Sequence, residues 1–135
     1  YKRQHEHILF SSNEAHIFHK IDRTQWVRVI TNLVQNALQS IPKNKTPQIG
    51  VQLLSENNQT ILSIVDNGNG ISPEVKEKIF EPKFTTKSSG MGLGLGIVKN
   101  IIESHEGSIK CMSKIKKGTT FVITLPKKAF SEKKQ

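Results

Sequence analysis

One stretch of this sequence repeats apolar residues with the period of an α-helix. The repeat consists of Trp26, Ile30, Leu33, Ala37 and Ile41. Apolar residues three and four positions apart form one stripe on a helix, and such a stripe has to be buried against another element. Asp22 and Gln25 have the spacing of a capping box, and Pro42 interrupts the pattern. We therefore predict a helix over residues 22–41 that packs through one face.

Two pairs of short apolar segments have the pattern of β-hairpins. The first pair is 48–54 and 60–65, which flank a polar turn. The second pair is 108–113 and 119–125, which flank a turn that contains Gly118. Four strands are therefore predicted to pair as antiparallel neighbours.

The remaining elements complete an α+β pattern. Residues 16–21 alternate as a short strand does, and Ser72 followed by Pro73 is typical of the start of a short helix. Apolar residues within 97–102 indicate a second long helix that ends near Gly107. Helices interspersed with hairpins must all cover one face of the same sheet. The predicted fold is a two-layer α/β sandwich with the order β-α-β-β-α-loop-α-β-β.

The composition is that of a single soluble globular domain. The chain has 135 residues, 35% of them hydrophobic, and no apolar stretch approaches the roughly 18 residues of a membrane span. A single cysteine, Cys111, excludes an internal disulfide and fits a reducing compartment. The net charge of +9 permits binding to nucleic acid, an anionic membrane or a phosphorylated ligand. Much of this charge lies near Lys116 and in the tail 127–135, so we interpret it mainly as solvated surface.

Four glycines alternate with other residues just before the second long helix. They are Gly90, Gly92, Gly94 and Gly96. A backbone with so few β-carbons can approach a bulky anion closely, and the start of a helix offers partial positive charge to phosphate. Glycine runs also form plain flexible turns, and this one lacks the Lys-Ser/Thr ending of a P-loop. The run alone leaves a phosphate site and a flexible turn open.

Three polar features each have a structural and a functional interpretation. Asn32 and Asn36 share one face of the predicted helix, either as solvated surface or as oxygen ligands of Mg²⁺. Asp66 ends a predicted strand, either as a turn residue or as an acceptor for an exocyclic amine. The segment 80–87 is either a hydrophobic loop anchor or a lid that brings Lys87 over a triphosphate.

The order of these features resembles a known family. The N, G1, F and G2 boxes of the ATP-binding catalytic domain of sensor histidine kinases are similar to four segments of this chain, 32–37, 66–70, 80–84 and 90–94. The similarity covers residues 16–126. It implies the Bergerat fold, a mixed sheet of about five strands with three helices on one face and a flexible ATP lid.

The resemblance also implies roles for individual residues. Asn36 would coordinate Mg²⁺, Asn32 would support the metal or the phosphates, and Lys87 would add positive charge beside them. Asp66 would accept a hydrogen bond from the adenine amino group, together with a water held by Thr119. The implied ATP contacts are Asn32, Asn36, Gln39, Asp66, Gly68, Gly70, Ile71, Phe84, Thr86, Lys87, Gly90, Met91, Gly92, Leu93, Gly94 and Thr119.

Three positions bear on the implied activity. Bergerat-type ATPases such as gyrase, heat-shock and mismatch-repair proteins carry Glu where Asn32 stands, and that Glu is the general base for attack by water. An amide cannot take the proton, so Asn32 favours a kinase over an ATPase. Many family members have a basic and then an aromatic residue where this chain has Gln39 and Ser40, so this helix lacks one expected phosphate contact and one adenine contact.

The resemblance therefore leads us to expect the catalytic domain of a two-component sensor histidine kinase, with ATP and Mg²⁺ as its cofactors. The γ-phosphoryl group would go to a histidine on a separate dimerisation domain, in cis or in trans, and then to a response-regulator aspartate. We expect a cytoplasmic location, with neither nucleic acid nor a membrane in contact with this part of the protein. Two alternatives stay open: an anti-sigma-type protein serine kinase, and a nucleotide-binding docking module without catalysis.

We expect three parts along the chain. Residues 1–15 would be the remnant of an upstream segment, either poorly ordered or a short strand, because the chain begins at Tyr1 rather than Met. Residues 16–126 would form the catalytic domain, and 127–135 would be a basic tail. A membrane anchor elsewhere in a longer protein stays open.

Overall fold

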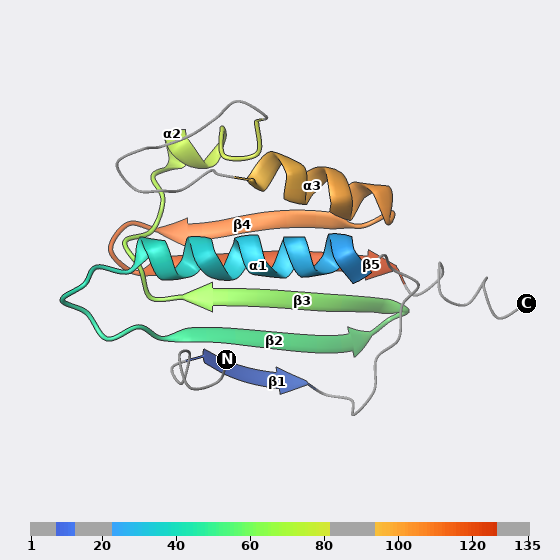
Figure 1. Cartoon of the computed structure of the whole chain (residues 1–135), viewed down its shortest axis with the longest axis horizontal. Helices are drawn as coiled ribbons and strands as arrows, with labels where there is room; N and C mark the ends of the chain where they lie inside the picture. Colours follow the sequence, from blue (N-terminus) through green and yellow to red (C-terminus); the bar gives the residue numbers. More distant parts are fainter. Residues whose placement is uncertain (1–7, 13–22, 82–93, 127–135) are drawn as a thin grey trace, which may run out of the picture.

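The computed structural model of the chain describes residues 8–12, 23–81 and 94–126. Its elements are, in chain order, β1 (Ile8–Ser12), α1 (Arg23–Ser40), β2 (Ile49–Glu56), β3 (Gln59–Asp66), α2 (Pro73–Lys76), α3 (Leu95–Ser104), β4 (Ser108–Lys114) and β5 (Gly118–Pro126). The strands form one five-stranded sheet in the order β1-β2-β3-β5-β4. Figure 1 shows the helices in front of this sheet, with α1 over its middle strands and α3 beside β4. The predicted two-layer α+β sandwich with a mixed sheet is confirmed.

The sheet is mixed because its first strand runs parallel to its neighbour. β1 pairs with β2 in parallel, with Ile8 opposite Ile49, whereas all the other pairs of strands are antiparallel. β1 lies within 1–15, where a short strand was one of the two alternatives; its bounds were not predicted, because the sequence shows no clear period there. The strand predicted over 16–21 lies outside the described residues.

Both predicted hairpins are present, and each strand is one or two residues longer in total than predicted, although β2 begins at Ile49 rather than at residue 48. Asn57 and Asn58 form the turn between β2 and β3 with φ angles of 50° and 61°. Two consecutive left-handed residues match the right-handed twist of the strands they join, and asparagine adopts that conformation more readily than most residues. The local sequence therefore sets the register of this hairpin.

The core lies between the helices and one face of the sheet. Along β5, every second residue is buried under α1 and α3, namely Thr119, Phe121, Ile123 and Leu125. The predicted stripe of α1 meets this face through Val29, Leu33 and Ala37. α3 adds Leu95, Val98, Ile101 and Ile102. α1 and α3 also meet where the ring of Trp26 packs edge-on against His105, with 5.9 Å between ring centroids.

The two shorter helix signals agree with the structure. Ser72 caps α2, since its side chain accepts a hydrogen bond from the Val75 amide at 3.3 Å, and Pro73 occupies the first turn as predicted. α3 begins directly after Gly94, so Gly96 is already helical. Among the described residues, no helix combines the length and the hydropathy needed to cross a membrane.

Neighbouring residues of β3 point to opposite faces, which allows a matched test of the core. Ile64 is 1% exposed and Val65 is 44% exposed. We expect Ile64→Ala to lower the free energy of unfolding by about 2–5 kcal/mol, because it removes buried methyl groups and leaves a cavity. Val65→Ala, the control on the open face, should cost less than about 1 kcal/mol. Urea unfolding measures both values, and equal losses would contradict this placement of the core.

Candidate functional site

A cavity of about 320 Å³ lies where the polar side of α1 meets the start of α3. Its lining residues are Arg28, Asn32, Gln35, Asn36, Gln39, Gly94 and Ile97. The α1 residues in this set are three or four positions apart, so one side of the helix supplies them all. The structure thus brings together four residues of the predicted site, namely Asn32, Asn36, Gln39 and Gly94.

Asn36 is a buried polar side chain in the lining of this cavity. It is 3% exposed, and its Nδ2 atom has no hydrogen-bond partner within the described part of the chain. A buried amide without a partner costs about 1–3 kcal/mol relative to a satisfied one. The interpretation of Asn36 as solvated surface is therefore wrong. The buried Nδ2 atom of Asn36 can instead donate hydrogen bonds to a ligand that enters the cavity.

Gly94 brings the backbone at the start of α3 close to Asn32. Its φ angle of 78° is in the left-handed region, and a β-carbon built there would lie 2.5 Å from the Nδ2 atom of Asn32. Any other residue at position 94 would therefore strain the backbone and require the Asn32 side chain to move. Gly94 is the N-cap of α3 and has no side chain, and no other described residue caps this helix start, whose first N–H groups carry the partial positive charge that suits an anion.

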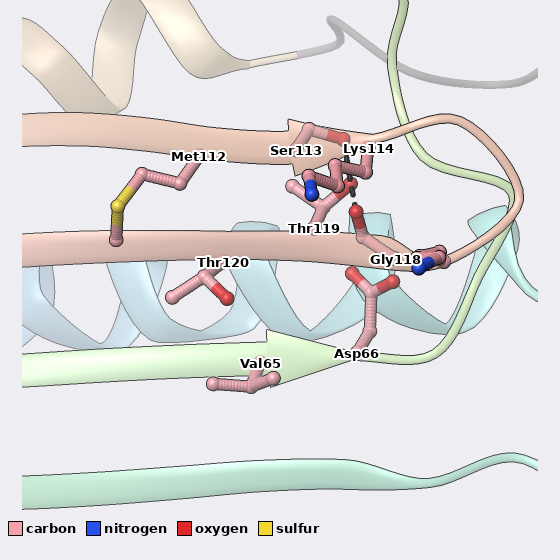
Figure 2. A pocket seen from close by; sticks show the side chains of 9 residues that line it. Val65, Asp66, Met112, Ser113, Lys114, Gly118, Thr119 and Thr120 are labelled. Carbon is pink, nitrogen blue, oxygen red and sulfur yellow. Dashed lines mark hydrogen bonds between the residues drawn. The ribbon is translucent and has the colours of Figure 1, made fainter.

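Asp66 occupies the last position of β3, at the other end of α1. Figure 2 shows its carboxylate directed toward Gly118 and Thr119 on β5. The Oδ1 atom accepts a hydrogen bond from the Gly68 amide at 2.8 Å and lies 3.3 Å from Oγ of Ser40. Burial raises the pKa of Asp66, whereas the hydrogen bonds from Gly68, Ser40 and Thr119, and the charge of Lys45, oppose that shift.

The loop after Asp66 is attached to α1. A β-carbon at Gly68 would collide with the hydroxyl and the backbone carbonyl of Ser40, so only glycine fits there. The amide of Asn69 donates to the carbonyl oxygen of Ser40 at 3.0 Å. These contacts join the loop that follows β3 to the C-terminal end of α1, the helix that carries Asn32 and Asn36.

The other side of the same loop is attached to the β4–β5 hairpin. The Ile71 amide donates to Oγ of Ser113 at 2.7 Å, and that hydroxyl lies 2.9 Å from Oγ1 of Thr119. Gly70 faces the carbonyl oxygen of Lys114 so closely that a β-carbon would not fit. Asp66, Ser113 and Thr119 also line a shallower cavity of about 340 Å³ between the ends of β3, β5 and β4 (Figure 2).

The predicted lid is described only at its start. Phe80 packs against Phe121 with 6.3 Å between ring centroids, and Nζ of Lys99 lies 5.8 Å from the centroid of the Phe80 ring. These contacts anchor the beginning of the segment on the core and on α3. The other predicted contacts of the lid lie outside the described residues: Phe84, Thr86, Lys87, Gly90, Met91, Gly92 and Leu93.

Several residues of the site were not predicted as contacts. Arg28, Gln35 and Ile97 line the cavity, and Ser40 and Ser113 hold the loop around Asp66. The helical period places Arg28 on the face of Asn32 and Asn36, four positions before Asn32, although no contact was assigned to it. The same period could have identified Ser40, four positions after Asn36. No local sequence pattern could have identified Ser113, because it reaches Ile71 and Thr119 only through the pairing of β4 with β5.

The residues present suit a nucleotide with its metal ion. Within the described residues, no group of three or more His, Cys, Asp or Glu side chains could hold a metal by itself. The amide oxygens of Asn32 and Asn36 are hard ligands, and Mg²⁺ usually combines such ligands with phosphate oxygens and water. A buried carboxylate at the C-terminal end of α1 suits a base, and the start of α3 beside Asn32, in the middle of α1, suits phosphates.

Comparison with known proteins agrees with this arrangement. Residues 21–129 match the family described as "Histidine kinase-, DNA gyrase B-, and HSP90-like ATPase". The chain belongs to this family. It is 40% identical over 119 residues to the sensor histidine kinase ZraS of Salmonella typhimurium, which covers 88% of the chain and 25% of ZraS. It is 41% identical over 108 residues to sporulation kinase A of Bacillus subtilis, covering 79% of the chain and 17% of that kinase.

Solved structures extend the similarity within the histidine kinase-like ATPase family to three dimensions. The catalytic domain of the histidine kinase ThkA superimposes with a TM-score of 0.79 at 35% identity, covering 93% of the chain and 82% of that domain. ThkA in complex with the response regulator TrrA gives a TM-score of 0.73 at 32% identity, covering 93% of the chain and 36% of ThkA. The chain spans a quarter or less of the two curated kinases, so it corresponds to one part of such proteins.

The raised pKa of Asp66 has a measurable effect on stability. Its folded pKa lies above the ordinary value of about 3.9, so this carboxyl stabilises the fold at low pH and less so as the pH rises through the folded pKa. The amide in Asp66→Asn does not titrate. We therefore expect the free energy of unfolding of Asp66→Asn, minus that of the wild type, to increase from about pH 4 to about pH 7.

Denaturant unfolding across that pH range measures this difference. Glu103→Gln, on the exposed side of α3, controls for the loss of one negative charge. A difference that stays constant or decreases with pH would show that burial does not govern the titration of Asp66.

Proposed function

We propose that this chain is the ATP-binding catalytic domain of a sensor histidine kinase. It transfers the γ-phosphoryl group of MgATP to a histidine on a separate dimerisation domain, from which the group passes to a response-regulator aspartate. We assign the activity to residues 16–126 and its location to the cytoplasm, with 1–15 and 127–135 as flanking segments. The observation that carries the proposal is the cavity where Asn32 and the buried Asn36 meet Gly94 at the start of α3.

The binding roles follow from where the groups lie along α1. Asp66, beside the last residue of the helix, accepts a hydrogen bond from the adenine amino group, and Thr119 lies next to it. Asn36 and Asn32 hold Mg²⁺ and the phosphates near the start of α3. The bound MgATP supplies the phosphoryl group, with Mg²⁺ offsetting charge on the phosphate oxygens. Gly68 and Gly94 keep the backbone clear where a β-carbon would intrude.

Asn32 supports transfer to a protein rather than hydrolysis. An amide accepts no proton at this position, so the chain lacks there the base that would activate water. A histidine nitrogen is itself a sufficient nucleophile: it forms the new N–P bond while the bond from phosphorus to the β–γ bridging oxygen breaks and ADP departs. Positioning and charge neutralisation are then the main tasks left to this domain.

An exposed apolar side chain in the cavity lining supports a partner domain there. Ile97 lines the cavity from α3 and is 41% exposed. A docked domain that covered this side chain would bring its histidine to the open side of the phosphates. The names of the relatives and the ThkA–TrrA complex support a place for this chain in such a signalling protein.

Phosphotransfer in trans tests the proposal. The chain, γ-labelled MgATP and a histidine-bearing phosphoacceptor domain of a sensor histidine kinase are mixed, and acid-labile phosphate on the acceptor is measured. We expect Asn36→Ala to lower the rate by about 100-fold, because it removes a ligand that orients charge at the reacting phosphate. Asp66→Ala should weaken nucleotide binding by about tenfold or more, since it removes a charged hydrogen-bond acceptor.

Asn100→Ala is the matched control, because Asn100 is an exposed asparagine of α3 outside the cavity lining. It should leave both measurements unchanged. Nucleotide binding without any transfer would support a docking module instead of a kinase. Acid-stable phosphoserine on a partner would support the serine kinase alternative.

A further inference from the structure

Arg28 lies on α1 one helical turn before Asn32 and two turns before Asn36. These side chains are four positions apart, so they share one face of the helix, and all three line the cavity at the start of α3. Gly94 lines the same cavity from the other helix. The guanidinium therefore belongs to the surface that faces the bound phosphates in the proposed function, on which this inference rests.

Arg28 is the one charged side chain among the described residues that line this cavity. The neighbouring lining residues are neutral amides, glycine and isoleucine, and within the described part of the chain no carboxylate pairs with Arg28. The start of α3, which no described side chain caps, adds partial positive charge beside the same cavity. The guanidinium of Arg28 on α1 and the first N–H groups of α3 together favour binding of an anion between the two helices.

The order of groups along α1 indicates which anion meets Arg28. Ser40, at the C-terminal end of the helix, lies 3.3 Å from Asp66, which receives the base in the proposed function. Arg28 lies twelve residues earlier, or about 18 Å along the helix axis at the usual rise per residue. A nucleotide whose base contacts Asp66 and whose metal contacts Asn36 therefore extends its terminal phosphate toward Arg28.

We infer that Arg28 is a phosphate-binding residue that contacts the γ-phosphoryl group and distinguishes ATP from ADP. A guanidinium can donate two parallel hydrogen bonds to phosphate oxygens, and it carries its charge at every pH of interest. The contact is lost once the γ-phosphoryl group has been transferred. Arg28 therefore contributes to affinity for the substrate and little to affinity for the product.

Affinity for two nucleotides tests the inference. Dissociation constants for the Mg²⁺ complexes of ADP and of the non-hydrolysable β,γ-imido analogue of ATP are measured for the wild type, Arg28→Gln and Arg28→Lys. We expect Arg28→Gln to weaken binding of the analogue by about tenfold and that of ADP by less than about twofold. Arg28→Lys should fall between the wild type and Arg28→Gln, since it keeps the charge without the paired donors.

Lys110→Gln is the matched control, because it removes one positive charge from an exposed position of β4 outside the cavity lining. It should change neither constant. Equal weakening of both nucleotides by Arg28→Gln, or no weakening of either, would overturn the inference while leaving the proposed function intact. A wild-type chain that bound neither nucleotide would overturn the proposed function and the inference with it.

Discussion

The contact between the end of α1 and the end of β3 holds the two halves of the site together. The Oγ atom of Ser40 lies 2.9 Å from the Ala37 carbonyl oxygen and 3.3 Å from Oδ1 of Asp66, so its single proton serves one of them at a time. The Ser40 carbonyl oxygen accepts from the Asn69 amide, and Gly68 packs directly against the same residue. Because Ser40, Asp66 and Gly68 are buried, a shift of the helix along the sheet would leave several of their polar atoms without partners.

This junction determines where the polar side of α1 lies relative to the carboxylate. Asn36 is one turn before Ser40, and Asn32 and Arg28 follow at the same spacing toward the start of the helix. Once the C-terminal end of α1 is fixed beside Asp66, the distance from this proposed base site to each of these side chains follows from the rise of the helix. A single rigid element therefore sets the length and the direction of the ligand site.

The helix also meets two opposite demands. The helix buries Val29, Leu33 and Ala37 against the sheet, and at the edge of this apolar stripe it places the amide of Asn36 out of water without a partner among the described residues. Apolar burial of the first kind contributes about 25 cal/mol per Å² and offsets the cost of the second. The proposed ligand accounts for this cost, because it would supply the missing polar contacts.

Much of this architecture could be predicted from the sequence, since the signals are local. The helical period of α1, the two hairpins and the Ser72-Pro73 start of α2 each depend on residues a few positions apart. The same holds for the pairing of Asn32 with Asn36 on one face. A short strand was one alternative for 1–15, but its bounds Ile8–Ser12 and its pairing were not predicted, because a short edge strand has little pattern of its own and takes its register from β2. Ser113 likewise joins the site only through the pairing of its strand with β5.

The sequence by itself therefore determined the helices, the two hairpins and the two-layer class, and it identified the residues that we propose bind a nucleotide. Tertiary structure alone decided that Asn36 is buried, that Arg28 and Gly94 share a cavity, and that Ser40 adjoins Asp66. The physical reason is one of range. The hydrophobic period of a helix, its caps and its turns depend on residues close together in the chain. The burial of a polar side chain, and the charged groups that surround it, depend on which distant segments pack together.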